Sequence, residues 1–575
     1  MTEEKKLTGY PSIDRPWLKY CPKVAPKGTD PNTSMVDFLW ECNRNGLQNV
    51  ALNYFERKIT YGELFENIDS VARSLCTLGV KQGDIVSVCP LNTPEFVYLL
   101  YAINKVGAVS NWIGLSSPIT DLHEQLISTN THFVFTVSLA YEQIKSAAEG
   151  SKVEKIITVP LENSMPVLLK TVLVLKNWRA IQGGIRWADF IKNQRRDTET
   201  VDINSDDIAL IEYTGGSTGV PKGVMLSNKA MNSYYVNFTG INYNRITEYK
   251  EGEKFLAGVP LFLAFGVSTC LHGALCHSLE LILAPDPSPK AGVQLILKTK
   301  VNHVIAGRLL VEALAETAKK KHADLSFIKS IMYGGEETNK AWESSVTKQL
   351  KTCNTDVPLL NGYGMTETSA AILVAPDNET DGLIPFVNVN VKIVDPDNET
   401  KEYSYNTEGE LCLSADTLMS GYYGNEKETK AVIFEENGLR WLKTHDLATV
   451  SPDGIIRITG RIKRIYSRLT PDRIQVRVYP MRIEEMLIQN ELVRECAVVG
   501  VKDDILAYRS VAFILPSNKA GDTEEAKKQL DAYCKANLPD SHWPDEYFFV
   551  DSFPTTRAGK VDYRALEKKP KAGIQ

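Results

Sequence analysis

Hydrophobic and polar positions follow a helical period in some stretches and a strand pattern in others, as far as about residue 450. A helix is predicted over residues 60–78, with Thr60 placed to cap it. Its apolar face consists of Leu64, Ile68, Val71 and Leu75. A second helix begins at Thr93-Pro94-Glu95 and extends to Val106. Short apolar strands are predicted at residues 85–88, 133–136, 155–159 and 208–211.

Strands that alternate with helices of this length are typical of parallel sheets covered by helices. We therefore expect an α/β fold with a large N-terminal domain of layered sheets over residues 1–460. After Gly460 the pattern changes to strands at 493–501, 510–515 and 547–550, with an amphipathic helix from Thr523 or Glu524 to Leu538. This order predicts a small mobile α+β C-terminal domain over residues 461–575, joined to the first by a hinge.

The composition supports two ordered domains. The chain has 575 residues, a length that exceeds what a single hydrophobic core normally supports. Of these residues, 43% are apolar, which argues against a disordered chain. A net charge of −6 gives no general attraction to nucleic acid or anionic membranes, so no nucleic-acid partner is expected. The ten cysteines have no metal-ligand spacing and are predicted to be free thiols.

One stretch, residues 255–279, lacks Asp, Glu, Lys and Arg and has the length of a membrane span. It contains Pro260 and several glycines, which favours a buried strand and helix of a large core. The first six residues include acids and no apolar run, so they do not resemble a secretory signal. We expect no transmembrane segment and a cytoplasmic protein.

A glycine- and hydroxyl-rich segment follows the apolar strand at 208–211, and it reads Tyr213-Thr214-Gly215-Gly216-Ser217-Thr218-Gly219-Val220-Pro221-Lys222-Gly223. Its glycines let backbone N–H groups approach an anion, the hydroxyls add donors, and Lys222 adds positive charge. It lacks the Gly-Lys-Ser/Thr of a Walker loop. A merely flexible loop would rarely concentrate these residues behind a buried strand, so we interpret the segment as a phosphate-binding loop.

This segment resembles the phosphate loop of the adenylate-forming superfamily, which includes acyl-CoA synthetases, adenylation domains of peptide synthetases and firefly luciferase. The resemblance extends in order from about residue 50 to Lys560 and is closest in style to a bacterial fatty acid–CoA ligase. It implies an enzyme that activates a carboxylic acid with ATP and Mg²⁺ as an acyl-adenylate, releases pyrophosphate and passes the acyl group to the thiol of CoA.

The resemblance implies roles for two further nucleotide-binding stretches. In Asn361-Gly362-Tyr363-Gly364-Met365-Thr366-Glu367, the tyrosine is expected to stack on adenine. Thr366 is expected to contact the α-phosphate, and Glu367 is expected to hold Mg²⁺, which prefers hard oxygen ligands. The stretch Tyr333-Gly334-Gly335-Glu336-Glu337 resembles the adenine-binding turn of the family.

Four charged residues complete the implied site. Asp446 corresponds to the aspartate that accepts hydrogen bonds from the ribose hydroxyls, and Arg461 corresponds to an arginine that reaches the nucleotide. Lys463 occupies the hinge position. Lys560, in Pro554–Val561, corresponds to the catalytic lysine that bridges the substrate carboxylate and the α-phosphate, where a positive charge stabilises the transferring group.

The segment Pro260–Gly266 resembles the motif that lines the acyl pocket. The expected pocket residues are Phe262, Leu263, Phe265, Gly266 and Asn361. Leu263 stands where many members carry a histidine, which makes the entrance apolar. This favours a medium- or long-chain fatty acid as substrate, with an aryl acid as second choice.

Further departures from the family pattern concern Gly215, which replaces a serine, His445, which replaces a glycine before Asp446, and the loop at 468–477. The segment from Arg461 to Pro480 that contains it is longer than in typical CoA ligases, and the run at 468–477 lacks their glycine and is rich in arginine. Its arginines could contact CoA phosphates or an acidic carrier protein. The alternatives are therefore an acyl-AMP ligase that loads an acyl or peptidyl carrier protein, and a non-catalytic nucleotide- or acyl-binding protein. The joint presence of the predicted catalytic and nucleotide-binding residues argues against the last.

Overall fold

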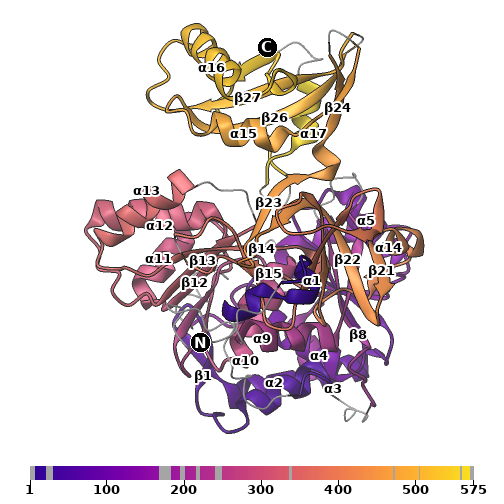
Figure 1. The fold of residues 1–575 in the computed structure, drawn as a ribbon. Helices are drawn as coiled ribbons and strands as arrows, with labels where there is room; N and C mark the ends of the chain where they lie inside the picture. The colour runs from indigo at the N-terminus through magenta and orange to yellow at the C-terminus, as the bar shows by residue number, and fades with distance from the viewer. Residues whose placement is uncertain are drawn as a thin grey trace, which may run out of the picture.

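The structure is a computed structural model that describes residues 7–20, 30–166, 183–194, 201–214, 221–239, 249–335, 340–377, 379–470, 473–503, 505–556 and 560–569. Its elements are arranged as a large N-terminal domain beneath a smaller C-terminal domain (Figure 1).

The first sheet of the N-terminal domain has parallel strands at its centre. In spatial order the described strands are β20 (Gly421–Tyr422), β9 (Gly223–Ser227), β8 (Ile208–Tyr213), β4 (Val109–Trp112), β3 (Ile85–Cys89), β5 (Phe133–Val137), β6 (Lys155–Val159) and β7 (Ile185–Arg186). Strands β8 to β7 are parallel, whereas β9 and β20 are antiparallel additions. The predicted strands at 85–88, 133–136, 155–159 and 208–211 are all confirmed.

A second sheet has the same plan. Its described strands, in order, are β16 (Ile384–Pro385), β15 (Ala371–Val374), β14 (Leu359–Gly364), β13 (Ser330–Gly334), β12 (His303–Ala306), β10 (Lys254–Ala257), β11 (Glu280–Leu283), β1 (Val50–Tyr54) and β2 (Arg57–Thr60). The strands from β14 to β1 are parallel, and such a sheet needs apolar cover on both faces.

Helices supply that cover. The longer ones are α2 (Met35–Asn43), α3 (Tyr61–Leu78), α4 (Pro94–Lys105), α5 (Ile119–Ser128), α9 (Asn228–Thr239), α11 (Pro289–Thr299), α12 (Arg308–Lys321) and α13 (Lys340–Lys351). The predicted helices at 60–78 and 93–106 are α3 and α4. Every apolar residue predicted for the inner face of α3 is at most 1% exposed, so the helical period identified the buried face correctly.

A third, antiparallel sheet completes the N-terminal domain. It consists of β18 (Asn398–Glu402), β17 (Asn390–Asp395), β19 (Gly409–Ser414), β22 (Leu439–Val450) and β21 (Ile433–Glu436), and β23 (Ile456–Arg461) also pairs with β22. The helix α14 (Glu426–Val432) precedes β21. Since β23 runs directly into the C-terminal domain, this sheet connects the two parts of the molecule (Figure 1).

The C-terminal domain has its own sheets and cores. A hairpin joins β24 (Tyr466–Leu469) to β25 (Gln475–Val478), and a second sheet contains β26 (Val493–Asp503), β27 (Ala507–Pro516) and β28 (Glu546–Phe549). Helices α15 (Pro480–Leu487), α16 (Thr523–Asn537) and α17 (Tyr563–Lys568) pack on the latter, and separate apolar clusters form on its two faces. The predicted α+β pattern is confirmed, while the exact boundary after Gly460 and the hinge stay predictions.

Among the described residues, three ion pairs join side chains that precede β23 to side chains that follow it. Arg308 Nη2 lies 2.9 Å from Glu495 Oε1, Arg482 Nη2 lies 2.7 Å from Glu408 Oε2, and Arg477 Nη2 lies 3.6 Å from Asp397 Oδ2. These contacts are polar and partly exposed, which is typical of domains that meet without sharing a hydrophobic core.

The charge-free stretch at 255–279 contains β10, a π-helix (η3, Phe265–Gly273) and α10 (Ala274–Cys276). The buried strand and helix expected there are present, although a wide π-helix could not be foreseen from the apolar run. Among the described residues, no helix has the length and apolar character needed to cross a membrane. Within this stretch, the buried His272 contacts the Tyr101 hydroxyl at 3.0 Å and the Asn232 amide oxygen at 3.1 Å. Burial lowers the pKa of His272 to about 3, so the ring is neutral.

The start of α3 provides a test of the sequence-derived fold. Thr60 accepts a hydrogen bond from the Glu63 backbone N–H, and Glu63 accepts one from the Thr60 backbone N–H, which is a complete capping box. Thr60→Ala should lower the free energy of unfolding by about 1 kcal/mol in urea titrations, whereas Thr60→Asn, which retains a capping oxygen, should remain within a few tenths of wild type. Equal loss in both variants would contradict the capping role.

Candidate active site

Asp446 of β22 is the meeting point of three predicted nucleotide-binding residues. The Tyr363 hydroxyl on β14 donates to Asp446 Oδ2 at 2.6 Å, and Arg461 Nε on β23 donates to Oδ1 at 2.7 Å. Asp446 is 3% exposed, so its charge depends on these two donors. Burial, and then the Asp446 charge, raise the pKa of Tyr363 well above its usual value, which keeps the phenol protonated as a donor.

Glu367 lies in the short helix η4 (Thr366–Thr368) directly after β14. Its Oε1 accepts a hydrogen bond of 2.8 Å from the Tyr422 hydroxyl on β20. The backbone carbonyl of Glu367 also accepts from the Met419 N–H at 2.9 Å, which fixes the residue against the segment before β20. Thr366 and Glu367 are both half-buried, so a ligand could reach them.

Of the side chains in the loop at 213–223 predicted to bind phosphate, the structure describes Thr214 and Lys222. The Lys222 ammonium lies 2.5 Å from Glu428 Oε2 on α14 and 4.7 Å from the centroid of the Tyr422 ring. Thr214 and Lys222 are joined by their backbones, because the Thr214 N–H donates to the Lys222 carbonyl at 3.1 Å. The predicted loop residues between them, Gly215, Gly216, Ser217, Thr218 and Gly219, lie outside the described residues, as does Glu336.

Lys463 follows β23 in the short helix η5 (Ile462–Arg464). Partial burial lowers its pKa, the positive charge of Lys222 lowers it further, and the charges of Glu428 and Glu367 oppose that shift. The predicted hinge lysine therefore belongs to the same charged cluster as the phosphate-binding lysine.

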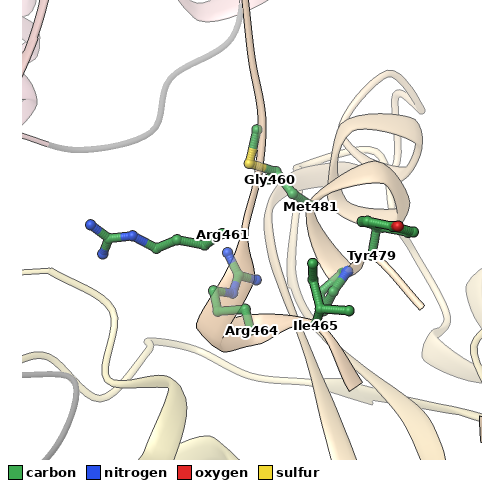
Figure 2. Close-up of a pocket in the computed structure, with 7 residues that line it drawn as sticks. Gly460, Arg461, Arg464, Ile465, Tyr479 and Met481 are labelled. Atoms are coloured by element: carbon green, nitrogen blue, oxygen red, sulfur yellow. The ribbon is translucent and has the colours of Figure 1, made fainter. Parts of the chain in front are cut away.

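A shallow pocket lies next to the segment that connects β23 to the C-terminal domain. Its lining residues are Gly460, Arg461, Arg464, Ile465, Tyr479, Pro480 and Met481 (Figure 2). Figure 2 shows that the Arg461 side chain extends away from the other labelled residues, in keeping with its bond to Asp446. Arg464 instead contacts Glu484 at 2.5 Å, and its guanidinium lies 3.7 Å from the centroid of the Tyr563 ring. The two arginines thus tie the connecting segment to opposite domains.

At two predicted positions the backbone explains why the residue is a glycine. Gly335, directly after β13, has φ +86, a left-handed backbone conformation that residues with a side chain rarely adopt. A Cβ on Gly364 would lie 2.0 Å from the Ala370 carbonyl oxygen, because the chain turns back tightly after β14.

The acyl-pocket motif begins at the turn before the π-helix. The Phe262 ring packs on Gly114, where an added Cβ would be 2.9 Å away, and a Cβ on Gly266 would lie 2.1 Å from the Pro260 carbonyl. Leu263 and Phe265 are half-buried against the main core. Asn361 lies opposite Tyr333 in the adjacent β13–β14 pair and is also half-buried.

A small cavity follows along the π-helix, beyond the acyl-pocket motif. Its volume is about 10 Å³, and its lining residues are Tyr234, Tyr235, Tyr249, Phe255, Thr269, Gly273, Ala274 and His277. That is room for about one water molecule. The Thr269 hydroxyl donates to the Tyr234 hydroxyl at 2.7 Å, so the lining is aromatic with polar groups.

Lys560 is exposed in the C-terminal domain. The Thr556 backbone N–H donates to the Lys560 carbonyl at 2.6 Å, and Thr555 pairs with Val561 in a single β-bridge, so Thr555 and Thr556 lie beside Lys560 and Val561. Residues 557–559 lie outside the described residues. Tyr563, the partner of Arg464, comes three residues after Lys560, so Lys560 closely precedes a contact with the connecting segment.

Two family models match this chain. Residues 38–423 match the model of the AMP-binding enzyme family, and residues 482–560 match the model of the AMP-binding enzyme C-terminal domain. The chain belongs to the AMP-binding enzyme family.

Curated relatives of this AMP-binding enzyme span nearly its whole length. A 4-coumarate–CoA ligase of Humulus lupulus is 27% identical over 523 residues, which is 89% of each chain. A long-chain-fatty-acid–CoA ligase of Bacillus subtilis (strain 168) is 26% identical over 572 residues, 96% of this chain and 97% of the relative. Among solved structures, an anthranilate CoA ligase in complex with anthranoyl-AMP superposes with a TM-score of 0.79 at 21% identity and covers 95% of this chain and 99% of its own. That likeness establishes the fold.

His445 stands where the sequence resemblance predicts a glycine, and its backbone conformation is one that glycine adopts without strain. His445 has φ +59, a left-handed conformation that costs an L-residue roughly 1–2 kcal/mol. Its Nδ1 lies 3.1 Å from Glu410 Oε1, and its backbone N–H donates to the same oxygen at 3.1 Å. Glu410 is 1% exposed, so this contact compensates part of the strain.

Sequence reasoning missed Tyr422 and Glu428. Tyr422 contacts both Glu367 and Lys222, and Glu428 pairs with Lys222. Tyr422 is 55 positions from Glu367 along the chain, and Glu428 is 206 positions from Lys222. A local sequence pattern therefore could not predict either contact.

The residues around Glu367 provide few protein ligands for a metal ion. Among the described residues, no group of three or more His, Cys, Asp or Glu side chains is arranged to hold a metal. A single carboxylate such as Glu367 nevertheless fits Mg²⁺, which usually keeps waters and binds through one or two carboxylates plus substrate phosphates.

Gly362 and Gly364 form a matched pair for testing the site. Gly364→Ala would collide with a backbone carbonyl and displace the Tyr363–Glu367 segment, so we expect at least a tenfold rise in the dissociation constant of AMP. Gly362→Ala meets no atom closer than 3.6 Å and should bind AMP like wild type. Calorimetric titration with AMP measures both, and equal affinities would contradict the steric argument.

Proposed function

We propose that the protein is an ATP-dependent acid–thiol ligase that converts a carboxylic acid to an acyl-adenylate, with release of pyrophosphate, and then transfers the acyl group to CoA. The observation that carries this proposal is the convergence of Tyr363, Arg461 and Asp446 beside Glu367 and Lys222. An aromatic face, a ribose-binding carboxylate and a phosphate-binding cation are the groups that a bound ATP requires.

In the first half-reaction the carboxylate attacks the α-phosphorus, and the bond to pyrophosphate breaks. Thr366 donates to an α-phosphate oxygen, and Lys222 neutralises the departing phosphates. When bound, Mg²⁺ supplies charge neutralisation, and Glu367 is the residue that would hold it. Lys560 approaches from the C-terminal domain and bridges the carboxylate and the phosphoryl group, a role that suits a long, flexible ammonium side chain.

In the second half-reaction the C-terminal domain turns about Lys463, which withdraws Lys560 and admits the thiol. The sulfur attacks the acyl carbonyl carbon, the bond to the AMP phosphate breaks, AMP leaves, and the thiol proton passes to solvent. The polar, partly exposed ion pairs between the domains support such a rearrangement, because they can be exchanged for water at small cost. Domain closure also excludes water from the reactive intermediate.

CoA is the preferred acceptor because the relatives over nearly the full chain bear the names of CoA ligases. The arginine-rich loop, which motivated a carrier-protein acceptor, is partly neutralised within the protein. Arg468 is 3.0 Å from Asp545 and 12% exposed, and Arg477 pairs with Asp397.

For the acid, the apolar Leu263 and the neighbouring Phe262 and Phe265 support a medium- or long-chain fatty acid. An aryl acid is the second candidate, because one of these relatives is named for an aryl acid.

The deciding experiment measures pyrophosphate release from ATP and Mg²⁺ with a panel of fatty and aryl acids, with and without CoA. We expect multiple turnovers only when CoA and a suitable apolar acid are both present. Release that is independent of CoA would favour loading of a carrier protein. ATP binding without release, for every acid, would favour the non-catalytic alternative and refute the proposal.

Lys560→Ala should lower the rate of acyl-adenylate formation by about 10²–10³-fold, the usual effect of removing one donor to a developing charge. AMP affinity should change little, because the proposed nucleotide contacts come from the N-terminal domain. Single-turnover measurement of adenylate formation tests this. The control is Lys568→Ala, an exposed lysine on α17 that should be silent. Full adenylation by Lys560→Ala would exclude the catalytic assignment.

A further inference from the structure

Lys222 has a carboxylate partner on α14. Its ammonium is 2.5 Å from Glu428 Oε2, and the lysine side chain is 18% exposed while the glutamate is 43% exposed. The Tyr422 ring lies on another side of the ammonium, at 4.7 Å from its centroid. The pair is therefore sheltered on the lysine side and open to solvent on the glutamate side.

Glu428 is held in this place by the start of α14. The Asn425 side chain caps that helix by accepting a hydrogen bond from the Glu428 backbone N–H at 3.2 Å. Thr429, the next residue, donates to the Asn425 carbonyl and accepts from the Tyr422 N–H, both at 2.9 Å. The same turn thus fixes both Glu428 and the tyrosine beneath Lys222.

The charges around this pair explain why a carboxylate is needed. The hydrogen bond from Lys222, and then its charge, lower the pKa of Glu428, so Glu428 is ionised at neutral pH. The positive charge of Lys222 lowers the pKa of Lys463, and the negative charge of Glu428 opposes that shift. Glu428 therefore offsets the repulsion between the two lysines.

A phosphate anion bound at Lys222 would serve the same purpose as Glu428. We propose that Glu428 is a positioning residue that competes with pyrophosphate for Lys222 and thereby favours release of that product. This inference rests on the proposed function for its place in the reaction. No covalent step is involved, because the ammonium exchanges one anionic partner for another.

The test measures binding of inorganic pyrophosphate with Mg²⁺ to the full chain by titration calorimetry, which does not require turnover. Glu428→Gln removes the competing charge and retains the shape. Its dissociation constant for pyrophosphate should fall about three- to tenfold, as expected for one partly exposed charge pair. Damage to the site would weaken binding instead, so the sign of the change separates the two explanations.

The matched control is Glu426→Gln, two residues earlier on α14. Glu426 is 80% exposed and pairs with Lys430 at 2.7 Å on the solvent side, so its loss should leave pyrophosphate affinity unchanged. In a Lys222→Met background, Glu428→Gln should lose most of its effect, since the competition acts through Lys222. Glu428→Ala serves as a second variant if the glutamine side chain re-forms a hydrogen bond.

Equal or weaker pyrophosphate binding in both Glu428 variants, with melting temperatures like wild type, would overturn the proposal. An equal gain in the Glu426→Gln control would also overturn it, because the effect would then be general charge. If Glu428→Gln tightens pyrophosphate binding but the wild type adenylates no acid in the panel, the competition stands and the proposed function fails.

Discussion

The site depends on one buried carboxylate. Asp446 accepts hydrogen bonds from Tyr363 and Arg461, and these residues come from the second sheet and from the last strand before the C-terminal domain. An unpaired charge at 3% exposure would be costly, so the two donors and the two strands that carry them must hold their places. The position of the C-terminal domain is in this way coupled to the stretch that is predicted to bind adenine, because Arg461 ends the strand from which that domain continues.

A second group of charges, of both signs, surrounds Lys222. Lys222 pairs with Glu428, the charges of Lys222, Glu428 and Glu367 all act on Lys463, and Tyr422 contacts Lys222 through its ring and Glu367 through its hydroxyl. Such an arrangement balances the charge of Lys222 within the protein and can still accept an anion, since each partner of Lys222 can be exchanged. A site built only from cations would bind phosphate more tightly but would release it more slowly.

Much of the architecture could be predicted, because local chemistry dictates it. The Thr60 cap, the apolar face of α3 and the β-branched strands all depend on neighbours in sequence, and each is present. The residues of the site could be named through family motifs, although their roles stay proposals. What could not be predicted depends on the tertiary fold. The π-helix needs a hydrogen-bond spacing that an apolar run does not specify, and the contacts of Tyr422 and Glu428 join segments more than fifty residues apart.

The three ion pairs between the domains make the relative orientation of the two domains sensitive to ionic strength. Arg308–Glu495, Arg482–Glu408 and Arg477–Asp397 are partly exposed, and surface pairs weaken as salt screens them. Each pair favours the relative orientation of the domains seen in this structure. If the C-terminal domain turns as proposed, the salt concentration helps to set how long the protein keeps this arrangement, and rates measured in different buffers then describe different mixtures of two domain arrangements.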